Sequence, residues 1–462
     1  MDNVMQLAEV RAPQVRDVRA NLVGELVLPG DSNWDEARLA WHLAVDQRPA
    51  AVVFAESAAD VAETVLAARS AGLRVAPQGT GHGAGSLGDL SDTILLRTTR
   101  MRGVTIDPHN RRARVEAGVI WQEVSDAAAE HGLAALAGSA HDVGVLGYAL
   151  GGGISWLARK HGLAANTILS ADIVDADGVE RTIDRDNDPA LFWAIRGGGG
   201  SFAIVTAVEL RLFPYAEVYA GTLFFPLERA REVLGAWLEW TETVPDEVMS
   251  VGRIMRFPDF PEVPEPLRGN GFALVEAVYL GDEAEGVELT RPLRELGPVL
   301  DTTAVIPARE LSRLHMDPPG PAPGMGDGYM LNELSPEAVD ALVQSAGAES
   351  GSSLVSVEVR HLGGALARTE EGDGAALLDK PFAMFAVGIA PTPEARRQTV
   401  HDVGHVLTAL APWDSGRDYS NWRETRSTGA RLFSPETYAR LREIKAEVDP
   451  DDVIRSHHPV VH

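Results

Sequence analysis

Two glycine-rich segments constrain the fold of this chain more than any other feature. Residues 78–85 read Gln-Gly-Thr-Gly-His-Gly-Ala-Gly, and residues 138–153 carry glycines throughout and end in Gly-Gly-Gly. Glycine lets a backbone approach a ligand closely and expose N–H groups to an anion such as a pyrophosphate. Neither segment has the Gly-Lys-Ser/Thr of a Walker A loop or the spacing of a Rossmann unit. The competing interpretation is a pair of tight turns without a ligand.

One histidine lies within the first of these segments. His82 stands between Gly81 and Gly83. A single histidine in a sequence is more often structural or solvent-exposed than functional. The flanking glycines, however, favour an accessible loop over a packed core position. His82 is therefore a candidate for direct contact with a bound ligand.

The composition limits the chemistry and the partners of the chain. Its 462 residues include no cysteine, which excludes disulfides, thiol catalysis and iron–sulfur sites. With 67 acidic and 41 basic side chains, the formal net charge is −26, which argues against nucleic acid and anionic membranes as partners. No stretch approaches the ~20 apolar residues of a membrane span, and no secretory leader is recognised. No metal site is predicted, and we expect a cytoplasmic protein with a small-molecule substrate.

The order of apolar runs and turn residues predicts a first domain built around the glycine-rich segments. A strand at residues 50–55, a helix between Ser57 and Gly72, and a strand at residues 73–77 form a β–α–β unit. The second strand leads directly into the first glycine-rich segment. Residues 1–49 are predicted to be a helical lead-in.

The character of the sequence changes at Pro214. Two hairpins, with turns at residues 107–110 and 177–178, are predicted before it. After it, strands alternate with acidic amphipathic helices. We therefore predict a first domain at residues 1–215 (core about 46–215), an inserted substrate-binding domain at residues 216–404, and a C-terminal segment at residues 405–462 that returns to the first domain.

The ordered motifs resemble those of the berberine-bridge-enzyme-like flavoproteins, within the vanillyl-alcohol-oxidase or PCMH-type FAD-binding superfamily. Beside the two glycine-rich segments, matches occur at residues 162–166, 191–199 and 202–206, in Tyr419-Ser420-Asn421-Trp422, and at residues 449–453. Between them, the resemblance depends mainly on residues 357–365. It implies an α+β fold in which a PCMH-type FAD-binding domain is split by an inserted domain with an antiparallel sheet.

The same resemblance implies FAD as the cofactor. In this family the histidine of the first glycine-rich segment is bonded through its ring to the 8α-methyl group of the flavin, and His82 occupies that position. The other residues that the resemblance places at the cofactor are Pro77, Gln78, Gly79, Thr80, Gly81, Gly83, Gly138, Ser139, Ala140, Asp142, Val143, Gly144, Gly147, Tyr148, Gly151, Gly152, Gly153, Ile154, Gly162, Asn166, Val205, Tyr419 and Asn421.

The chain departs from the family pattern at two positions. Many members attach the flavin a second time, through a cysteine in the second segment, and Ala140 stands at that position. A second link of this kind is chemically impossible here, so the flavin is expected to be monocovalent through His82, or non-covalent. The other departure is Trp422, where several members carry a tyrosine that accepts the substrate proton. An indole N–H donates a hydrogen bond but is no general base.

Several polar side chains are candidates for catalysis. Tyr419 is retained, although its pKa of ~10 would have to fall before it could act as a base, and it could equally be a packing residue. Glu358 and Arg360 would share one side of a strand, with His361 on the other, and solvent exposure is the alternative. We predict Tyr419, Trp422, Glu358 and Arg360 as catalytic residues. Further candidates for the pocket wall are His141, Tyr148, Trp156, His457 and His458.

We predict an FAD-dependent oxidoreductase and, within that class, an oxidase. It would move a hydride from a substrate C–H bond to flavin N5, and dioxygen would reoxidise the flavin with release of hydrogen peroxide. The aromatic side chains expected at the pocket favour a small hydrophobic or aromatic metabolite over a sugar. The alternatives are a flavin-dependent cyclase, isomerase or dehydrogenase without net oxygen use, a catalytically silent flavin-binding protein, and an NAD-dependent Rossmann enzyme.

Overall fold

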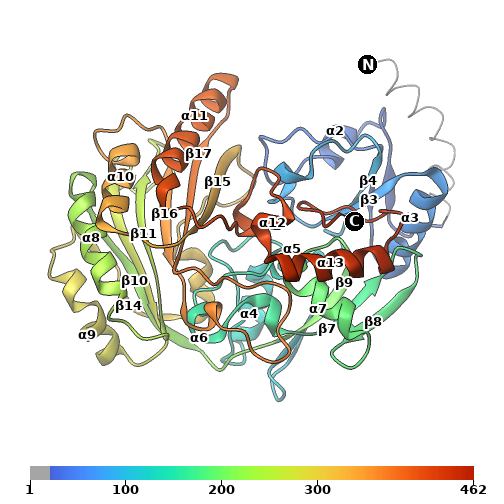
Figure 1. Ribbon diagram of the computed structural model, residues 1–462, viewed down its shortest axis with the longest axis horizontal. Helices are drawn as coiled ribbons and strands as arrows, with labels where there is room; N and C mark the ends of the chain where they lie inside the picture. Colours follow the sequence, from blue (N-terminus) through green and yellow to red (C-terminus); the bar gives the residue numbers. More distant parts are fainter. Residues whose placement is uncertain (1–20, 462) are drawn as a thin grey trace.

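The computed structural model describes residues 21–461 of the chain (Figure 1). The predicted helical lead-in therefore lies partly outside the described residues. In its described part the prediction is wrong, because the chain there forms strand β1 (Glu25–Val27) and a single short helix, α2 (Trp34–Ala37). Leu26 and Val27 are buried because β1 pairs antiparallel with strand β2 (Ala51–Phe54).

A four-stranded sheet of order β1-β2-β4-β3 carries the first glycine-rich segment. Strands β2, β4 (Thr93–Arg97) and β3 (Arg74–Gln78) run parallel, and helix α3 (Ala58–Ala71) connects β2 to β3, which confirms the predicted β–α–β unit. The helix begins at Ser57, whose hydroxyl accepts the N–H of Asp60, and ends at Gly72, whose φ is 61°. The glycine-rich segment therefore leaves from the carboxyl end of β3.

A five-stranded antiparallel sheet of order β5-β6-β9-β7-β8 lies beside it. Its strands are β5 (Val104–Asp107), β6 (Arg112–Glu116), β7 (Ile168–Val174), β8 (Glu180–Asp184) and β9 (Ile204–Arg211). Both predicted hairpins, β5–β6 and β7–β8, are confirmed. The helices of this region are α4 (Trp121–Ala129), α5 (Val145–Leu150), α6 (Ala158–His161) and α7 (Pro189–Gly198). The second glycine-rich segment runs into α5 and out of it.

The third sheet has eight strands and is antiparallel, in the order β13-β10-β12-β11-β16-β17-β15, with β14 paired to β10. Its strands are β10 (Glu217–Pro226), β11 (Val248–Arg256), β12 (Gly271–Tyr279), β13 (Leu300–Asp301), β14 (Ala304–Pro307), β15 (Gly324–Leu331), β16 (Ser356–His361) and β17 (Phe382–Ile389). Helices α8 (Ala230–Thr241), α9 (Glu283–Arg294), α10 (Pro336–Ala346) and α11 (Pro393–Leu410) cover its outer side (Figure 1). The α+β fold with an antiparallel sheet in the inserted region is confirmed, whereas the domain boundaries stay a prediction, and residue 404 lies within α11.

The two faces of this large sheet differ in chemistry. Val357 and Val359 of β16 join the apolar core formed with the covering helices. Glu358 and Arg360 alternate with them and are also buried, at 3% exposure each. These charged side chains therefore lie on the inner face, the side turned away from the helices and toward the first part of the chain (Figure 1).

The C-terminal segment returns to the first sheet. Helix α12 (Gly429–Leu432) is followed by α13 (Pro435–Val448), which packs against α7 (Figure 1). Beyond it, Ile454 forms a parallel bridge with Val75 of β3. The buried carboxylate of Asp449 fixes this turn, because it accepts the N–H groups of Val453 and Ile454 and the ammonium of Lys445. Within residues 21–461, no helix has the length and apolar character needed to cross a membrane.

Candidate active site

The two glycine-rich segments lie against each other and present free backbone donors. Within the described chain, the N–H groups of residues 79–83 and 138–144 donate no backbone hydrogen bond. The second segment is fixed instead through its carbonyl groups, since those of His141 and Val143 accept the N–H groups of Gln122 and Trp121 at 2.9 and 3.0 Å. A Cβ atom on Gly144 would lie 3.8 Å from the nitrogen of Thr80. The structure thus brings both segments together, as predicted for one ligand site.

His82 is held by one residue from each segment and by a tryptophan from outside them. Its Nδ1 lies 2.7 Å from the hydroxyl of Thr80, and its Nε2 lies 3.5 Å from Asp142 Oδ1. The Trp41 indole stacks on the imidazole, with centroids 4.0 Å apart and planes 20° apart. No described atom forms a hydrogen bond with the buried Nε2. One ring nitrogen of His82 is therefore free for another interaction.

The end of the second segment is shaped by Tyr419. Its hydroxyl accepts the N–H groups of Gly153 and Ile154, each at 3.1 Å, and the amide of Asn421 at 3.0 Å. Gly153 has a φ of +80°, and a Cβ there would lie 2.7 Å from that of Ala164, so only glycine fits. Burial raises the pKa of Tyr419 well above its usual value. Tyr419 therefore acts here as a neutral hydrogen-bond acceptor that supports the glycine turn.

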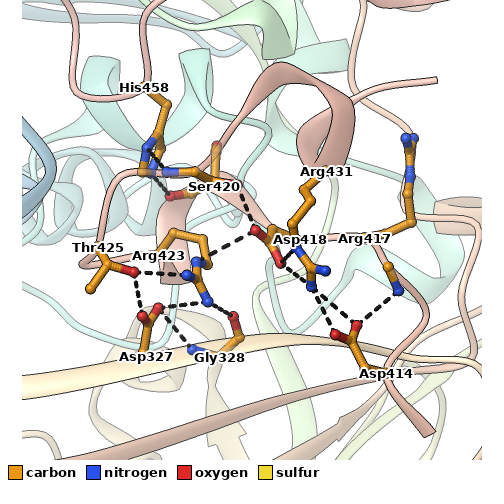
Figure 2. Close-up of polar contacts among 12 residues, drawn as sticks. Asp327, Gly328, Asp414, Arg417, Asp418, Ser420, Arg423, Thr425, Arg431 and His458 are labelled. Atoms are coloured by element: carbon orange, nitrogen blue, oxygen red, sulfur yellow. Dashed lines mark hydrogen bonds and ion pairs between the residues drawn. The ribbon is translucent and has the colours of Figure 1, made fainter. Parts of the chain in front are cut away.

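A polar network holds the Tyr419 segment against the large sheet (Figure 2). The buried carboxylate of Asp418 contacts Arg423 at 3.5 Å and Arg431 at 2.8 Å. Arg423 also donates to the carbonyl of Gly328 and pairs with Asp327, both on β15 and both at 3.1 Å. The segment that carries Tyr419, Asn421 and Trp422 is thereby tied to the inserted region.

A second buried cluster lies on the inner face of the large sheet. The imidazole of His315 bridges two carboxylates, with Nδ1 2.6 Å from Glu276 and Nε2 in contact with Glu358. Arg360 pairs with Glu358 at 3.0 Å, and Arg253 pairs with Glu276 at 3.3 Å. Burial alone would lower the pKa of His315, but the two glutamates raise it to about 9. At neutral pH His315 is therefore a buried cation.

The same cluster sets the charge of Glu358. Burial alone would raise the pKa of this carboxyl, but Arg360 and the His315 cation hold it well below its usual range. Glu358 is thus ionised at neutral pH and a weak proton acceptor. The sequence-based prediction that Glu358 and Arg360 share one side of β16 is confirmed by their ion pair.

Aromatic side chains surround Arg360. Its guanidinium carbon lies 5.0 Å from the ring centre of Trp422 and 5.5 Å from that of Trp156. Its Nε is buried and has no hydrogen-bond partner among the described residues. Trp156 lies three residues after the end of the second glycine-rich segment, so the cluster lies close to that segment. The predicted residues Arg360, Trp156 and Trp422 therefore meet at one place.

Other predicted residues lie elsewhere. Asn166 accepts the N–H of Gly374, and a Cβ on Gly162 would approach the carbonyl of Ala365, so both contact loops of the inserted region. Val205 is buried within β9. His361, on the other side of β16 from Arg360, contacts Arg159, and the predicted wall residue His458 bonds the carbonyl of Ser420 and the N–H of Ser427. The roles predicted for all these residues stay predictions.

Sequence reasoning missed four residues of these clusters. Arg253 and Glu276 are single charges within otherwise apolar runs, at residues 248–255 and 272–280, and this pattern is a usable signal for a buried ion. Trp41 and His315 carry no such signal. Their roles depend on long-range contacts that a local pattern does not encode.

The residues present fit FAD. The unpaired N–H groups of residues 79–83 and 138–144 are suited to a pyrophosphate. Room for a ligand exists beside them, because a Cβ on Gly147 would meet no atom within 4 Å and one on Gly83 would have its nearest neighbour, His457, at 3.8 Å. The free Nε2 of His82 lies in the same region. Within the described residues, no group of three or more acidic or histidine side chains could hold a metal ion.

Comparisons with known proteins agree with this site. A family model described as "FAD binding domain" matches residues 49–184, and one described as "Berberine and berberine like" matches residues 418–461. The chain is 29% identical to (R)-6-hydroxynicotine oxidase of Paenarthrobacter nicotinovorans, over 95% of this chain and 97% of that protein. It is 32% identical to glucooligosaccharide oxidase of Sarocladium strictum, over 46% of this chain and 44% of that protein.

A solved structure shares the whole fold. BBE-like 1 of Physcomitrella patens superimposes with a TM-score of 0.84, covers 97% of this chain and 99% of its own, and is 20% identical. The two matched domains contain the glycine-rich segments and the Tyr419 segment, which are the parts that form the site. The chain therefore contains an FAD-binding domain and a berberine-like domain, and together with its relatives these identify it as an FAD-linked oxidoreductase with the fold of the BBE-like enzymes.

Proposed function

We propose that this FAD-dependent oxidoreductase is an oxidase for a small aromatic substrate that carries an oxygen atom. The observation that carries the proposal is the position of Arg360, buried between Trp156 and Trp422 with a free Nε. Two indole rings offer flat apolar surface to an aromatic ring. The free N–H of Arg360 can donate to a substrate oxygen and stabilise negative charge there. FAD, when bound, supplies the hydride acceptor and the reaction with dioxygen.

The chain's own residues position and desolvate the substrate in this proposal. The side chains of Glu358, Arg360 and Tyr419 are buried, so a substrate that reached them would be shielded from water. Tyr419 keeps its proton and supports the turn at Gly153, so we assign it a positioning role. Glu358 stays ionised and fixes Arg360, rather than accepting the substrate proton. The guanidinium instead favours substrates whose own hydroxyl is acidic, such as phenols and hydroxylated heterocycles.

The names of two relatives bear on the choice of substrate. One oxidises a hydroxylated heterocyclic amine by its name and aligns over almost its full length, while the oligosaccharide oxidase aligns over less than half. The aromatic surroundings of Arg360 favour the first substrate class. A dehydrogenase or cyclase that does not use dioxygen remains the second candidate, because nothing in the side chains around Arg360 selects the electron acceptor.

The attachment of the cofactor is also part of the proposal. We infer a single covalent bond, from His82 to the 8α-methyl group of the flavin. His82 is the only predicted attachment residue, and Ala140 offers no sulfur for a second bond. A cytoplasmic location remains a prediction.

Anaerobic mixing with candidate substrates tests the proposed reaction. We expect hydroxylated N-heterocycles and aromatic alcohols to bleach the yellow flavin absorbance, and oligosaccharides not to. Readmission of air should restore the colour with one hydrogen peroxide per turnover. Bleaching that only an artificial electron acceptor reverses would indicate a dehydrogenase. Bleaching by oligosaccharides alone would contradict the aromatic substrate class, and none by any compound would favour a silent flavin-binding protein.

Replacing Arg360 by methionine sharpens the test. The variant keeps much of the side-chain volume but loses the donor and the charge. We expect the KM for a hydroxylated substrate to rise by about 10- to 100-fold, because the substrate oxygen loses its charged partner. Arg256→Met, at the end of β11 and away from the two tryptophans, is the matched control. An unchanged KM would remove Arg360 from substrate recognition.

A further inference from the structure

We propose that Asp142 activates His82 for covalent attachment of FAD, with Trp41 and Thr80 holding the two side chains in place. The inference rests on the proposed covalent bond and adds residues that position its nucleophile.

The His82 ring is fixed on several sides. Trp41 covers one face of the ring at 4.0 Å, and Thr80 contacts Nδ1 at 2.7 Å. Trp41 is itself held at the first glycine-rich segment, because its backbone N–H donates to the carbonyl of Thr80 at 2.9 Å. A histidine between glycines would otherwise have many orientations, so these contacts reduce the entropy that must be lost before reaction.

Asp142 is likewise held, from two directions. Its Oδ2 accepts the indole N–H of Trp41 at 2.6 Å and the N–H of Gly320 at 3.2 Å. The other oxygen, Oδ1, has no such partner and lies 3.5 Å from His82 Nε2. Burial alone would raise the pKa of Asp142, but the His82 ring and the Trp41 N–H lower it to about 2. The carboxylate is therefore charged at every physiological pH and directs one oxygen at the imidazole.

The chemistry of attachment explains why a carboxylate belongs there. A ring nitrogen forms a bond to the 8α carbon, while one C–H bond of that methyl group and one N–H bond of the imidazole break. Two protons and two electrons are released in this step; the flavin would take up the electrons, and dioxygen would then accept both electrons and both protons as hydrogen peroxide. Whichever nitrogen reacts, the ring gains positive charge as the bond forms. A fixed carboxylate stabilises that charge and favours the reactive tautomer, as in other Asp–His pairs.

The alternative is a purely structural role, in which Asp142 only ties Trp41 to Gly320. The two readings predict different results for Asp142→Asn. Asparagine can retain a hydrogen bond to Trp41 but has no charge. If the role is structural, covalent attachment should proceed normally in every molecule that binds FAD. If Asp142 activates His82, FAD should bind while the bond forms slowly.

The experiment measures covalent and total flavin separately in the full-length protein. Each variant is purified, and its total bound FAD is read from absorbance. Acid precipitation then separates covalent flavin in the pellet from released flavin in the supernatant, and intact mass follows the covalent fraction during incubation with excess FAD in air. For Asp142→Asn we expect unchanged total FAD and attachment at least about tenfold slower than in the wild type. Asp142→Glu, which keeps the charge, should recover part of the rate.

Trp41→Phe and Thr80→Val provide independent variants, since each leaves the carboxylate but loosens one partner. We expect both to slow attachment less than Asp142→Asn does, and they keep the proposal testable should that variant not fold. Asp402→Asn, at a carboxylate on α11 bonded to Ser353, is the matched control and should attach FAD at the normal rate. Attachment at the wild-type rate in Asp142→Asn, or loss of total FAD from it, would overturn the proposal. Absence of covalent flavin from the wild type would instead refute the bond at His82 itself.

Discussion

Two histidines of this molecule, His315 and His82, lie beside carboxylates, and they differ in how many of their ring nitrogens already have a partner. Both nitrogens of His315 are engaged, by Glu276 and Glu358, and the ring is a buried cation with a pKa of about 9. His82 has one nitrogen near Thr80 and the other without a hydrogen-bond partner in the described chain. The neighbouring carboxylate is that of Asp142, whose Oδ1 lies 3.5 Å from His82 Nε2, slightly too far for a hydrogen bond.

The difference separates an electrostatic role from a chemical one. Buried ions are costly unless each is paired, and the inner-face cluster satisfies this condition with alternating charges. A histidine so paired can orient its neighbours but has no lone pair with which to attack. His82 keeps a nitrogen available, and its surroundings restrain the ring without consuming it. This difference supports our proposals that the first glycine-rich segment forms the bond to the flavin and that the inner face of the large sheet positions the substrate.

The largest expected effect is on the attachment of flavin. His82→Ala removes the only nitrogen that we assign to the bond, so the covalent fraction should fall from nearly complete to none. Total FAD should fall less, because the backbone donors of residues 79–83 and 138–144 remain. Acid precipitation measures both quantities. His109→Ala, in the exposed turn between β5 and β6, is the control and should leave the flavin in the pellet; covalent flavin persisting in His82→Ala would show that the bond lies elsewhere.

The next effect concerns the stability of the inner-face cluster. His315→Gln removes the cation between Glu276 and Glu358, and the glutamine carbonyl would face a carboxylate. Breaking a buried charge pair in this way should lower the free energy of unfolding by about 3–5 kcal/mol at pH 7. Urea unfolding measures the change, with the exposed His405→Gln on α11 as the control. A loss below 1 kcal/mol would mean that the cluster is solvated rather than buried.

The pH dependence of stability follows from the same pair of carboxylates. The folded-state pKa of His315, about 9, is above its usual value of 6.5, so its contribution is full below pH 6.5 and is lost as pH rises through 9. The loss should reach roughly 3 kcal/mol. Burial also raises the pKa of Glu424 to about 7, so its contribution to stability is lost as pH rises from 4.5 to 7.

Unfolding at pH 4.5, 7 and 9.5 distinguishes these two contributions, since Glu424 acts mainly in the lower interval and His315 in the upper one. Between pH 7 and 9.5 the wild type should lose stability, whereas His315→Gln should show a nearly flat profile because it lacks the titrating ring. Glu424→Gln should flatten only the lower interval. Identical slopes in the wild type and in His315→Gln above pH 7 would contradict a protonated His315.

The smallest effect is expected at Tyr419. In Tyr419→Phe the N–H groups of Gly153 and Ile154 lose an acceptor, although Ile154 can still reach the hydroxyl of Tyr148 at 3.2 Å. Stability should fall by about 1–2 kcal/mol. The rate of flavin reduction by substrate should change by less than about threefold, since a base would cost 100-fold or more.

Stopped-flow absorbance measures that reduction rate. Tyr438→Phe, on α13 and stacked on Phe433, controls for the loss of a tyrosine hydroxyl. A large drop in rate for Tyr419→Phe alone would reinstate Tyr419 as the proton acceptor.

Much of the first half of the fold could be predicted because its signals are local. The cap at Ser57, the left-handed Gly72 and the two hairpin turns each depend on a few adjacent residues, and all are confirmed. The prediction of a helical lead-in is wrong because strand β1 forms only through pairing with β2, which no local pattern encodes. The same limitation applied to Trp41, whose ring reaches His82 across the fold.

The candidate site was predictable where residue identity alone carries the chemistry. His82, the glycine-rich segments and the alternation at Glu358 and Arg360 could be read from spacing and resemblance. The charge state of Glu358 could not, because it depends on His315 and Arg253, which reach it from other parts of the fold. Tyr419 shows the same dependence, since its burial and three donors set its role.

The most direct test of the account is the mass of the intact, denatured wild-type protein, followed by isolation of the flavin-bearing peptide. The account predicts one FAD per chain after denaturation, bonded within the peptide that contains His82 and to His82 itself. A protein mass equal to that of the bare chain, with yellow flavin in the supernatant, would contradict the covalent bond. A flavin on any other residue would contradict the role assigned to His82.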